Sequence, residues 1–254
     1  MQIGAITGYI DVAQLALYAF WLFFAGLLIY LRREDKREGY PLQSDRSAHV
    51  TVQGFPPLPA PKSFHLADGR TQTAPRAEGP QPPCYAAPTA AWPGAPLQPV
   101  GNPMLSGVGP AAFAYRANEP ELVLATGKPR VVPLRVATDH AIAEEDPDPR
   151  GMEVVGADGE VAGVVREAWI DRSETMLRYL EVEIVAGARV LLPMTLVRLS
   201  GSRVRVASVL ARQFADAPRH SRPDQVTLRE EDAIGAYFAS GHLYATPERA
   251  EPLL

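Results

Sequence analysis

The most constraining feature of the sequence is an uncharged, apolar run near its start. Residues 12–31 read VAQLALYAFWLFFAGLLIYL, and Gln14 is the one clearly polar side chain among them. An α-helix rises about 1.5 Å per residue, so this run would be roughly 30 Å long, the thickness of the hydrocarbon core of a bilayer. In lipid, a helix pairs its backbone N–H and C=O groups within a single segment. The run therefore predicts one transmembrane helix, with Asp11 as its N-cap.

Two other interpretations of this run fit less well. A cleaved signal peptide begins with basic residues and ends at a site of small residues. Residues 1–11 contain no Lys or Arg, and the run ends directly in charged residues. A buried helix of a globular domain would carry a polar stripe, which this run lacks. Gln14 either faces another helix in the membrane or lies near enough to the interface to be hydrated, and the sequence leaves both open.

The charges on the two sides of the run predict its orientation. The segment RREDKRE (32–38) contains four Lys or Arg residues, whereas residues 1–11 contain none. Lys and Arg are enriched on the cytoplasmic side of membrane helices. We therefore expect a periplasmic N-terminus (1–11), a charged membrane-edge segment (32–40) and a cytoplasmic remainder.

The next segment, residues 41–115, is rich in proline. Residues 41–110 hold 15 of the 25 prolines, and no charged side chain lies between Gly79 and Tyr115. Proline lacks an N–H and fixes φ, so long helices and central strands are excluded here. Disordered linkers are usually charged and poor in aromatic residues. This segment has a long uncharged part and contains several aromatic residues. We interpret it as an extended segment on a surface, and favour the surface of a partner over that of this chain.

Residues 116–254 predict a mainly-β domain with a C-terminal helix. Asp158-Gly159 is a hairpin signal between two apolar arms. Several short strands separated by turn signals favour a small antiparallel barrel, closed or half-closed; the strands are expected at 130–136, 151–171, 176–185, 189–194 and 203–210. Thr227 and Glu230 form a capping box for a helix over 228–240, which Gly241 would end.

The composition argues against several classes of function. The net charge is -4 and no long basic block lies beyond the membrane edge, so a nucleic-acid partner is not expected. Cys84 is the single cysteine, so an internal disulfide and a cysteine-based zinc site are excluded, and the five histidines are scattered. The sequence has no Gly-rich phosphate loop, HExxH or GxSxG motif.

Two groups of acidic residues carry the most chemistry. Glu144 and Glu145 lie near His140, and Asp171 and Glu174 follow a predicted strand with Arg178 close by. The plainer interpretation of each is a hydrated surface. The alternative is a proton path, because neighbouring, partly buried carboxylates have their pKa values spread by repulsion and desolvation.

Several stretches along nearly the whole chain resemble the H subunit of the purple bacterial photosynthetic reaction centre, a member of the PRC-barrel family. The most specific are AQLALYAFWLFFAGLLIYLRREDKREGYPL (13–42) and VTLREEDAIGAYFASGHLYATPERAEPLL (226–254). Shorter ones include PLPAPKSF, GNPMLSGVGPAA, VPLRVATDHAIAEEDPDPRGM, RYLEVEI and LLPM. The resemblance is weakest over 43–57 and 70–98.

This resemblance implies a non-catalytic subunit that caps the L and M subunits in the bacterial inner (intracytoplasmic) membrane. Bacteriochlorophyll, bacteriopheophytin, quinones and non-haem iron would belong to the complex, with none bound by this chain directly. A cytochrome subunit and a light-harvesting antenna can accompany such a complex. The subunit would stabilise the assembly during light-driven electron transfer and conduct protons toward the secondary quinone.

The resemblance also implies a proton relay. Asp171, Glu174 and Arg178, which follow Trp169, match family positions on the proton route, and Glu230 and Glu231 lie on the associated side. Some members have histidines at the proton entry just before the first barrel strand. Here that stretch reads LVLATGKPR (122–130), without a histidine or an acid. We therefore expect entry elsewhere, with His140, Glu144 and Glu145 as candidates.

Two rival functions remain open. One is a membrane-anchored PRC-barrel adaptor of another membrane assembly, with no proton-conducting role. The other is a membrane-tethered enzyme, which the missing motifs disfavour. The sequence does not distinguish between ubiquinone and menaquinone.

Overall fold

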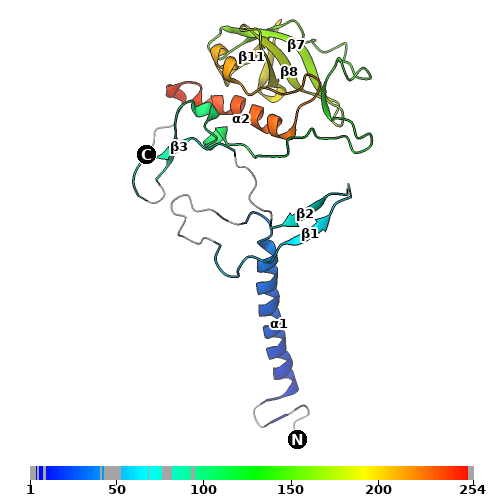
Figure 1. Ribbon diagram of the computed structural model, residues 1–254, viewed down its shortest axis with the longest axis vertical. Helices are drawn as coiled ribbons and strands as arrows, with labels where there is room; N and C mark the ends of the chain where they lie inside the picture. Colours follow the sequence, from blue (N-terminus) through cyan, green and yellow to red (C-terminus); the bar gives the residue numbers. More distant parts are fainter. Residues whose placement is uncertain are drawn as a thin grey trace. The chain divides into compact units, whose positions relative to one another are not determined.

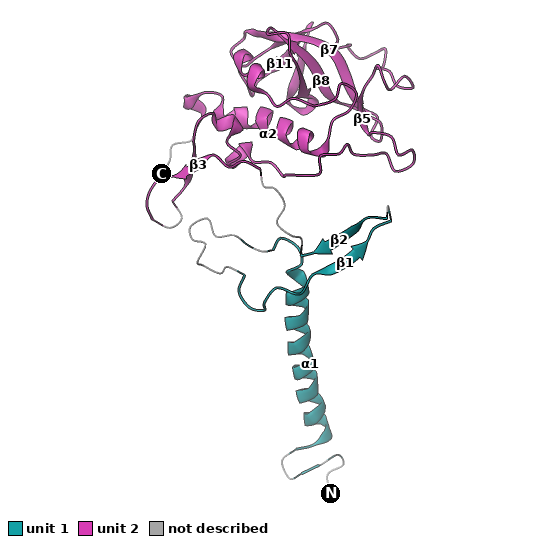
Figure 2. Ribbon diagram, in the orientation of Figure 1, with its two compact units in different colours: residues 1–80 teal, residues 81–254 magenta. Residues whose placement is uncertain are grey.

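The computed structural model describes residues 4, 6–7, 10–40, 42, 53–67, 69–75, 82–92 and 95–250. Its contacts divide the chain into two compact units, residues 1–80 and 81–254 (Figure 2). Most of the predicted N-terminal tail, parts of the predicted 41–115 segment and residues 251–254 lie outside the described residues.

The apolar run forms helix α1, Val12–Asp35 (Figure 1). As predicted, Asp11 is its N-cap, and the Asp11 carboxylate accepts from the Gln14 amide at 2.7 Å. The Gln14 side chain donates to the Tyr18 hydroxyl at 3.0 Å, so its partner lies on the same helix. Within the described residues, α1 is the one helix long and apolar enough to cross a membrane, and none of its side chains is buried by the chain.

Two basic side chains that follow helix α1 form hydrogen bonds with the backbone of the next segment. Lys36 is buried, and its ammonium donates to the carbonyls of Gln53, Gly54 (3.1 Å) and Pro56 (2.6 Å). Arg37 donates to two further backbone carbonyls, at 2.7 and 2.9 Å. This part of the first unit ends in a hairpin of two short strands, β1 (Lys62–His65) and β2 (Thr71–Ala74).

The described part of the proline-rich segment in the second unit folds onto its own chain. It contains a short strand pair, β3 (Ala86–Pro88) and β4 (Leu97–Pro99), and two 3-10 turns, η1 (Pro103–Leu105) and η2 (Gly109–Ala111). Both turns pack against the C-terminal helix, which buries Met104 and Ala111.

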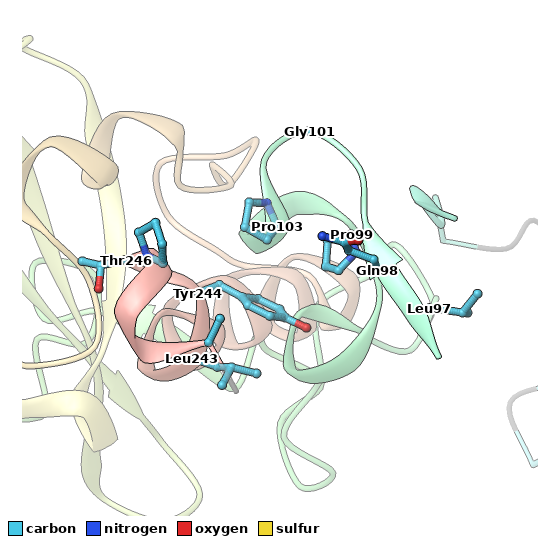
Figure 3. Close-up of a pocket in the computed structure, with 10 residues that line it drawn as sticks. Leu97, Gln98, Pro99, Gly101, Pro103, Leu243, Tyr244 and Thr246 are labelled. Atoms are coloured by element: carbon cyan, nitrogen blue, oxygen red, sulfur yellow. The ribbon is translucent and has the colours of Figure 1, made fainter. Parts of the chain in front are cut away.

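An apolar pocket of about 540 Å³ is lined by residues of this segment and of the C-terminal part of the chain (Figure 3). Pro99 and Pro103 line it from the extended segment, and Leu243 and Tyr244 line it from the C-terminal helix. Tyr85, Trp92 and Val100 of the segment remain largely exposed, so its apolar side chains are only partly covered by the chain itself.

The second unit is built around one seven-stranded sheet, so the predicted mainly-β domain is confirmed. The strand order is β10-β11-β6-β7-β8-β9, with β5 also paired to β7. All pairs are antiparallel except β6 with β11, and the sheet does not close. The strands are β5 (Val131–Pro133), β6 (Glu153–Val155), β7 (Val161–Asp171), β8 (Met176–Ile184), β9 (Arg189–Pro193), β10 (Val197–Ser200) and β11 (Arg203–Val206).

The predicted hairpin joins β6 to β7, and Gly159 supplies the positive φ of 82° that its turn requires. Trp169, Leu180 and Leu191, from β7, β8 and β9, are completely buried in the core. Three more short 3-10 helices complete the unit: η3 (Met194–Leu196), η4 (Ala211–Asp216) and η5 (Pro247–Arg249).

Helix α2, Leu228–Tyr244, covers this core with Ile234, Tyr237 and Phe238. It begins with the predicted Thr227 capping box but continues beyond the predicted end at residue 240. Gly241 is therefore not the stop. It lies inside the helix at a close approach to the backbone of Ser208, where a Cβ atom would collide with the Ser208 carbonyl.

Candidate functional site

The first charged group lies where β5 begins and β7 ends. The two strands pair with Val131 opposite Asp171, which places Arg130 beside the Asp171 carboxylate. The Arg130 Nε lies 2.9 Å from both carboxylate oxygens, and the amides of Ser173 and Glu174 donate to Oδ1 at 2.9 and 3.1 Å. Burial opposes ionisation of Asp171, but these donors outweigh it, so the pKa of Asp171 is lowered.

Arg130 joins Asp171 to two more carboxylates. Its guanidinium lies 3.1 Å from Glu121 and 3.1 Å from Glu174. Asp171 is 1% exposed, whereas Glu121 and Glu174 are 44% and 60% exposed, so the group runs from water to a buried carboxylate. The bond to Asp171 raises the pKa of Arg130, which therefore remains a cation. We call these four residues the Arg130 group.

The second charged group surrounds Glu231, in the first turn of α2. The Tyr179 hydroxyl donates to Glu231 Oε2 at 2.9 Å, and Arg178 Nη2 lies 4.0 Å from the same oxygen. Burial raises the pKa of Glu231, and the hydrogen bond from Tyr179 and the charge of Arg178 only partly oppose this. Burial and the neighbouring Glu231 carboxylate raise the pKa of Tyr179 as well. We call these three residues the Glu231 group.

Glu121 links the two groups electrostatically. Its negative charge pairs with Arg130 and also raises the pKa of Glu231. Ionisation of Glu231 is therefore disfavoured by a carboxylate of the Arg130 group.

Glu230 serves the fold and lies in neither group. Its carboxylate accepts from the amide of Thr227 at 2.8 Å, which completes the capping box, and also from the amide of Ser221 at 2.7 Å. Burial opposes ionisation of Glu230, but these amides outweigh it and its pKa is lowered. Although Glu230 and Glu231 are adjacent in sequence, a helix turns about 100° between them, so their side chains point to different partners.

The candidate entry residues lie in another part of the second unit. His140 Nδ1 is 3.0 Å from Asp139, and His140 and Glu144 line a polar pocket of about 410 Å³ that Glu145 does not line. Within the described part of the chain, no hydrogen bond or ion pair connects His140, Glu144 or Glu145 to the Arg130 group or to the Glu231 group.

The most buried glutamate among the described residues was not one of the predicted site residues. Glu181, on β8, is 2% exposed and accepts from Trp169 Nε1 at 3.0 Å and from Arg189 at 2.7 Å. Arg135 lies 3.3 Å from Glu181 and 3.7 Å from Glu167. Burial opposes ionisation of Glu181, but these donors outweigh it and lower its pKa, so it is a structural anion in the sheet.

The structure thus divides the predicted relay. It joins Asp171 to Glu174 through Arg130, joins Arg178 to Glu231, and separates Glu230 from both. Sequence reasoning missed Arg130, Glu121 and Tyr179. Arg130 and Glu121 carried a weak signal, since Glu121 precedes the stretch where the resemblance implies proton entry and Arg130 is the last residue of that stretch. Among the described residues, no group of three His, Cys, Asp or Glu side chains could hold a metal ion.

Two family models match the chain. One is described as photosynthetic reaction centre, H-chain N-terminal region, and matches residues 4–136, just over half of the chain. The other is described as a PRC-barrel domain and matches residues 142–213, which include strands β6 to β11.

Proposed function

This chain belongs to the H-chain family of the photosynthetic reaction centre, and we propose that it caps the L and M subunits and conducts protons toward the secondary quinone. The family is a non-catalytic subunit of a complex with other subunits, anchored here by the apolar helix α1. We propose that the N-terminus is periplasmic and the barrel cytoplasmic, since Lys and Arg follow α1 and do not precede it. Bacteriochlorophyll, bacteriopheophytin, quinones and iron would be held by the partner subunits.

The observation that carries the proton-conducting role is the raised pKa of Glu231 beside a group of carboxylates that reaches water. A buried carboxyl with a raised pKa exchanges a proton nearer neutral pH than an ordinary glutamate does. Glu174 and Glu121 are exposed enough to take protons from solvent. Asp171 remains ionised beside Arg130, so its role is to hold that guanidinium in place and to supply negative charge.

The capping role is supported by apolar surface on the second unit. Tyr85, Trp92 and Val100 are 59%, 63% and 58% exposed, and the stretch that contains them has no charged side chain. Exposed apolar patches on a folded unit mark surfaces for other proteins. Co-purification of the chain with bacteriochlorophyll-bearing subunits in mild detergent is expected, and a pigment-free monomer would contradict this part of the proposal.

Flash-induced proton uptake by the assembled complex, on double reduction of the secondary quinone, tests the relay. Glu231→Gln and Glu174→Gln should each slow proton uptake, because each removes a group that carries a proton. Glu183→Gln is the matched control. Glu183 is a partly exposed glutamate on β8. It pairs with Arg166 at 3.1 Å and belongs to neither group.

The adaptor function predicts a different outcome. If the complex assembles and both relay variants take up protons as fast as the Glu183→Gln control, the chain acts as an interaction module without a proton-conducting role. Infrared spectroscopy would then measure the pH at which the Glu231 carboxyl loses its proton, in complexes with and without the Glu174→Gln change. This measurement does not depend on reduction of the quinone.

A further inference from the structure

The outer edge of the sheet carries an arginine pair that the proposed function does not use. Arg198 on β10 and Arg205 on β11 lie directly opposite each other across the antiparallel pair, and both are exposed. Like charges in this position destabilise a strand pair. Neither side chain has a hydrogen bond or an ion pair with any residue that the structure describes.

The neighbouring position makes the contrast clear. Arg203, also on β11, pairs with Glu153 of β6 at 3.1 Å. The sheet thus supplies a carboxylate for Arg203 but, among the described residues, none for Arg198 and Arg205. An anion from outside the chain would neutralise this pair.

The two unpaired arginines line a pocket of about 570 Å³, and the C-terminal part of the chain adds His242 and Arg249 to its wall. No Asp or Glu is among the described residues that line it. Asp158, which lies between the lining residues Ala157 and Gly159 in sequence, directs its carboxylate to the amide of Ala211 at 3.2 Å.

Arg249 is held in a fixed position in this wall. Its Nη1 donates to the carbonyls of Ser208 at 2.8 Å and Gly241 at 2.9 Å. Two backbone carbonyls orient the guanidinium without neutralising it, so its charge remains available to the pocket. A cation that is already ordered loses little conformational entropy when it binds an anion.

We propose that this basic pocket, formed by Arg198, Arg205, His242 and Arg249, binds a phosphate-bearing anion. Guanidinium groups match phosphate oxygens with pairs of parallel hydrogen bonds, and three arginines line this pocket. The volume falls in the range of small-molecule sites and exceeds that of a single phosphate. A phospholipid headgroup and a free diphosphate share this chemistry.

The test uses the full-length chain in neutral detergent and phosphate-free buffer. Isothermal titration with inorganic phosphate and with pyrophosphate should give saturable binding. A second arm adds mixed micelles of phosphatidylglycerol or of phosphatidylcholine. If pyrophosphate saturates the site and phosphatidylglycerol does not displace it, the ligand is a free phosphate. If phosphatidylglycerol micelles displace pyrophosphate and phosphatidylcholine micelles do not, the ligand is a lipid headgroup.

The variant Arg198→Gln/Arg205→Gln should weaken binding by roughly tenfold or more, because it removes charge-assisted hydrogen bonds. Arg203→Gln/Arg219→Gln is the charge-matched control, since it removes two cations that do not line the pocket. Arg198→Glu should place a carboxylate opposite Arg205, raise the melting temperature and abolish binding. Equal weakening by the control, a linear unsaturable signal, or no binding of any of these anions would overturn the proposal.

Discussion

The Arg130 group and the Glu231 group bury a carboxylate in opposite ways. Asp171 is surrounded by donors, a guanidinium and two amides, and its pKa is lowered. Glu231 has one phenolic donor and a more distant arginine, and its pKa is raised, chiefly by burial. The comparison teaches that burial alone does not decide the direction in which the pKa of a carboxylate shifts, because hydrogen-bond donors and nearby cations oppose the effect of burial.

Among these variants, removal of Arg130 should cause the largest loss of unfolding free energy. Arg130→Gln leaves the Asp171 carboxylate buried with only its two amide donors, and loss of one partner of a buried pair costs about 3 kcal/mol of unfolding free energy. Chemical unfolding of the full-length chain in detergent measures this. Arg166→Gln, which breaks the more exposed pair with Glu183, should cost much less, because solvent screens that pair. Equal losses in the two variants would mean that Asp171 does not depend on Arg130.

The two carboxylates should give stability a pH dependence of opposite sign. The pKa of Asp171 is lowered from 3.8, so its contribution is present above pH 3.8 and is lost as the pH falls through the folded-state pKa. The pKa of Glu231 is raised from 4.5, so its contribution is present below pH 4.5 and is lost as the pH rises through the folded-state pKa.

Unfolding free energies of Asp171→Asn and Glu231→Gln, measured against pH, separate these contributions. The difference between the wild type and Asp171→Asn should shrink toward low pH. The difference between the wild type and Glu231→Gln should change in favour of the variant as the pH rises above 4.5. If the difference in unfolding free energy from the wild type changed with pH in the same direction for both variants, the two carboxylates would not differ in the proposed way.

A smaller effect is expected from Tyr179→Phe. The Tyr179 hydroxyl stabilises the ionised form of Glu231, so its loss should raise the pKa of Glu231 further. The infrared band of the protonated carboxyl, assigned by its absence in Glu231→Gln, should persist to higher pH. Stability should fall by about 1 kcal/mol for the lost hydrogen bond. A band that disappears at lower pH than in the wild type would contradict this.

The smallest effect concerns the link between the groups. Glu121→Gln removes a negative charge that raises the pKa of Glu231, so this pKa should fall slightly. The shift should weaken at high salt, because Glu121 is 44% exposed and its field is screened. Titration of the same infrared band at low and high ionic strength measures this shift. An unchanged pKa, or a raised one, would contradict the effect of Glu121 on Glu231.

Features with a local physical cause could be predicted from the sequence. The apolar run, the Asp11 cap, the Asp158-Gly159 turn and the Thr227 capping box each depend on residues within a few positions of one another. All four are present in the structure. The parallel pairing of β6 with β11 and the short strand β10 were not predicted, because pairing between distant segments leaves no local pattern.

The site was harder to predict for the same reason. The contact of Arg130 with Asp171 depends on the register of β5 against β7, two segments 41 positions apart. Alternation along a strand puts Glu181 and Glu183 on the same face of β8, and this pattern gives no sign that Glu181 is buried. Its carboxylate is enclosed by Trp169, Arg135 and Arg189, which come from three other segments of the chain.

The close approach of Gly241 to Ser208 has a consequence at the opposite end of α2. The helix cannot slide or turn about its axis there without a collision between two main chains. One residue of slippage would swing Glu231, ten positions earlier, by about 100° and remove it from the Tyr179 hydroxyl. A hydrogen atom in place of a methyl group thus sets the alignment on which the acidity of a distant carboxyl depends.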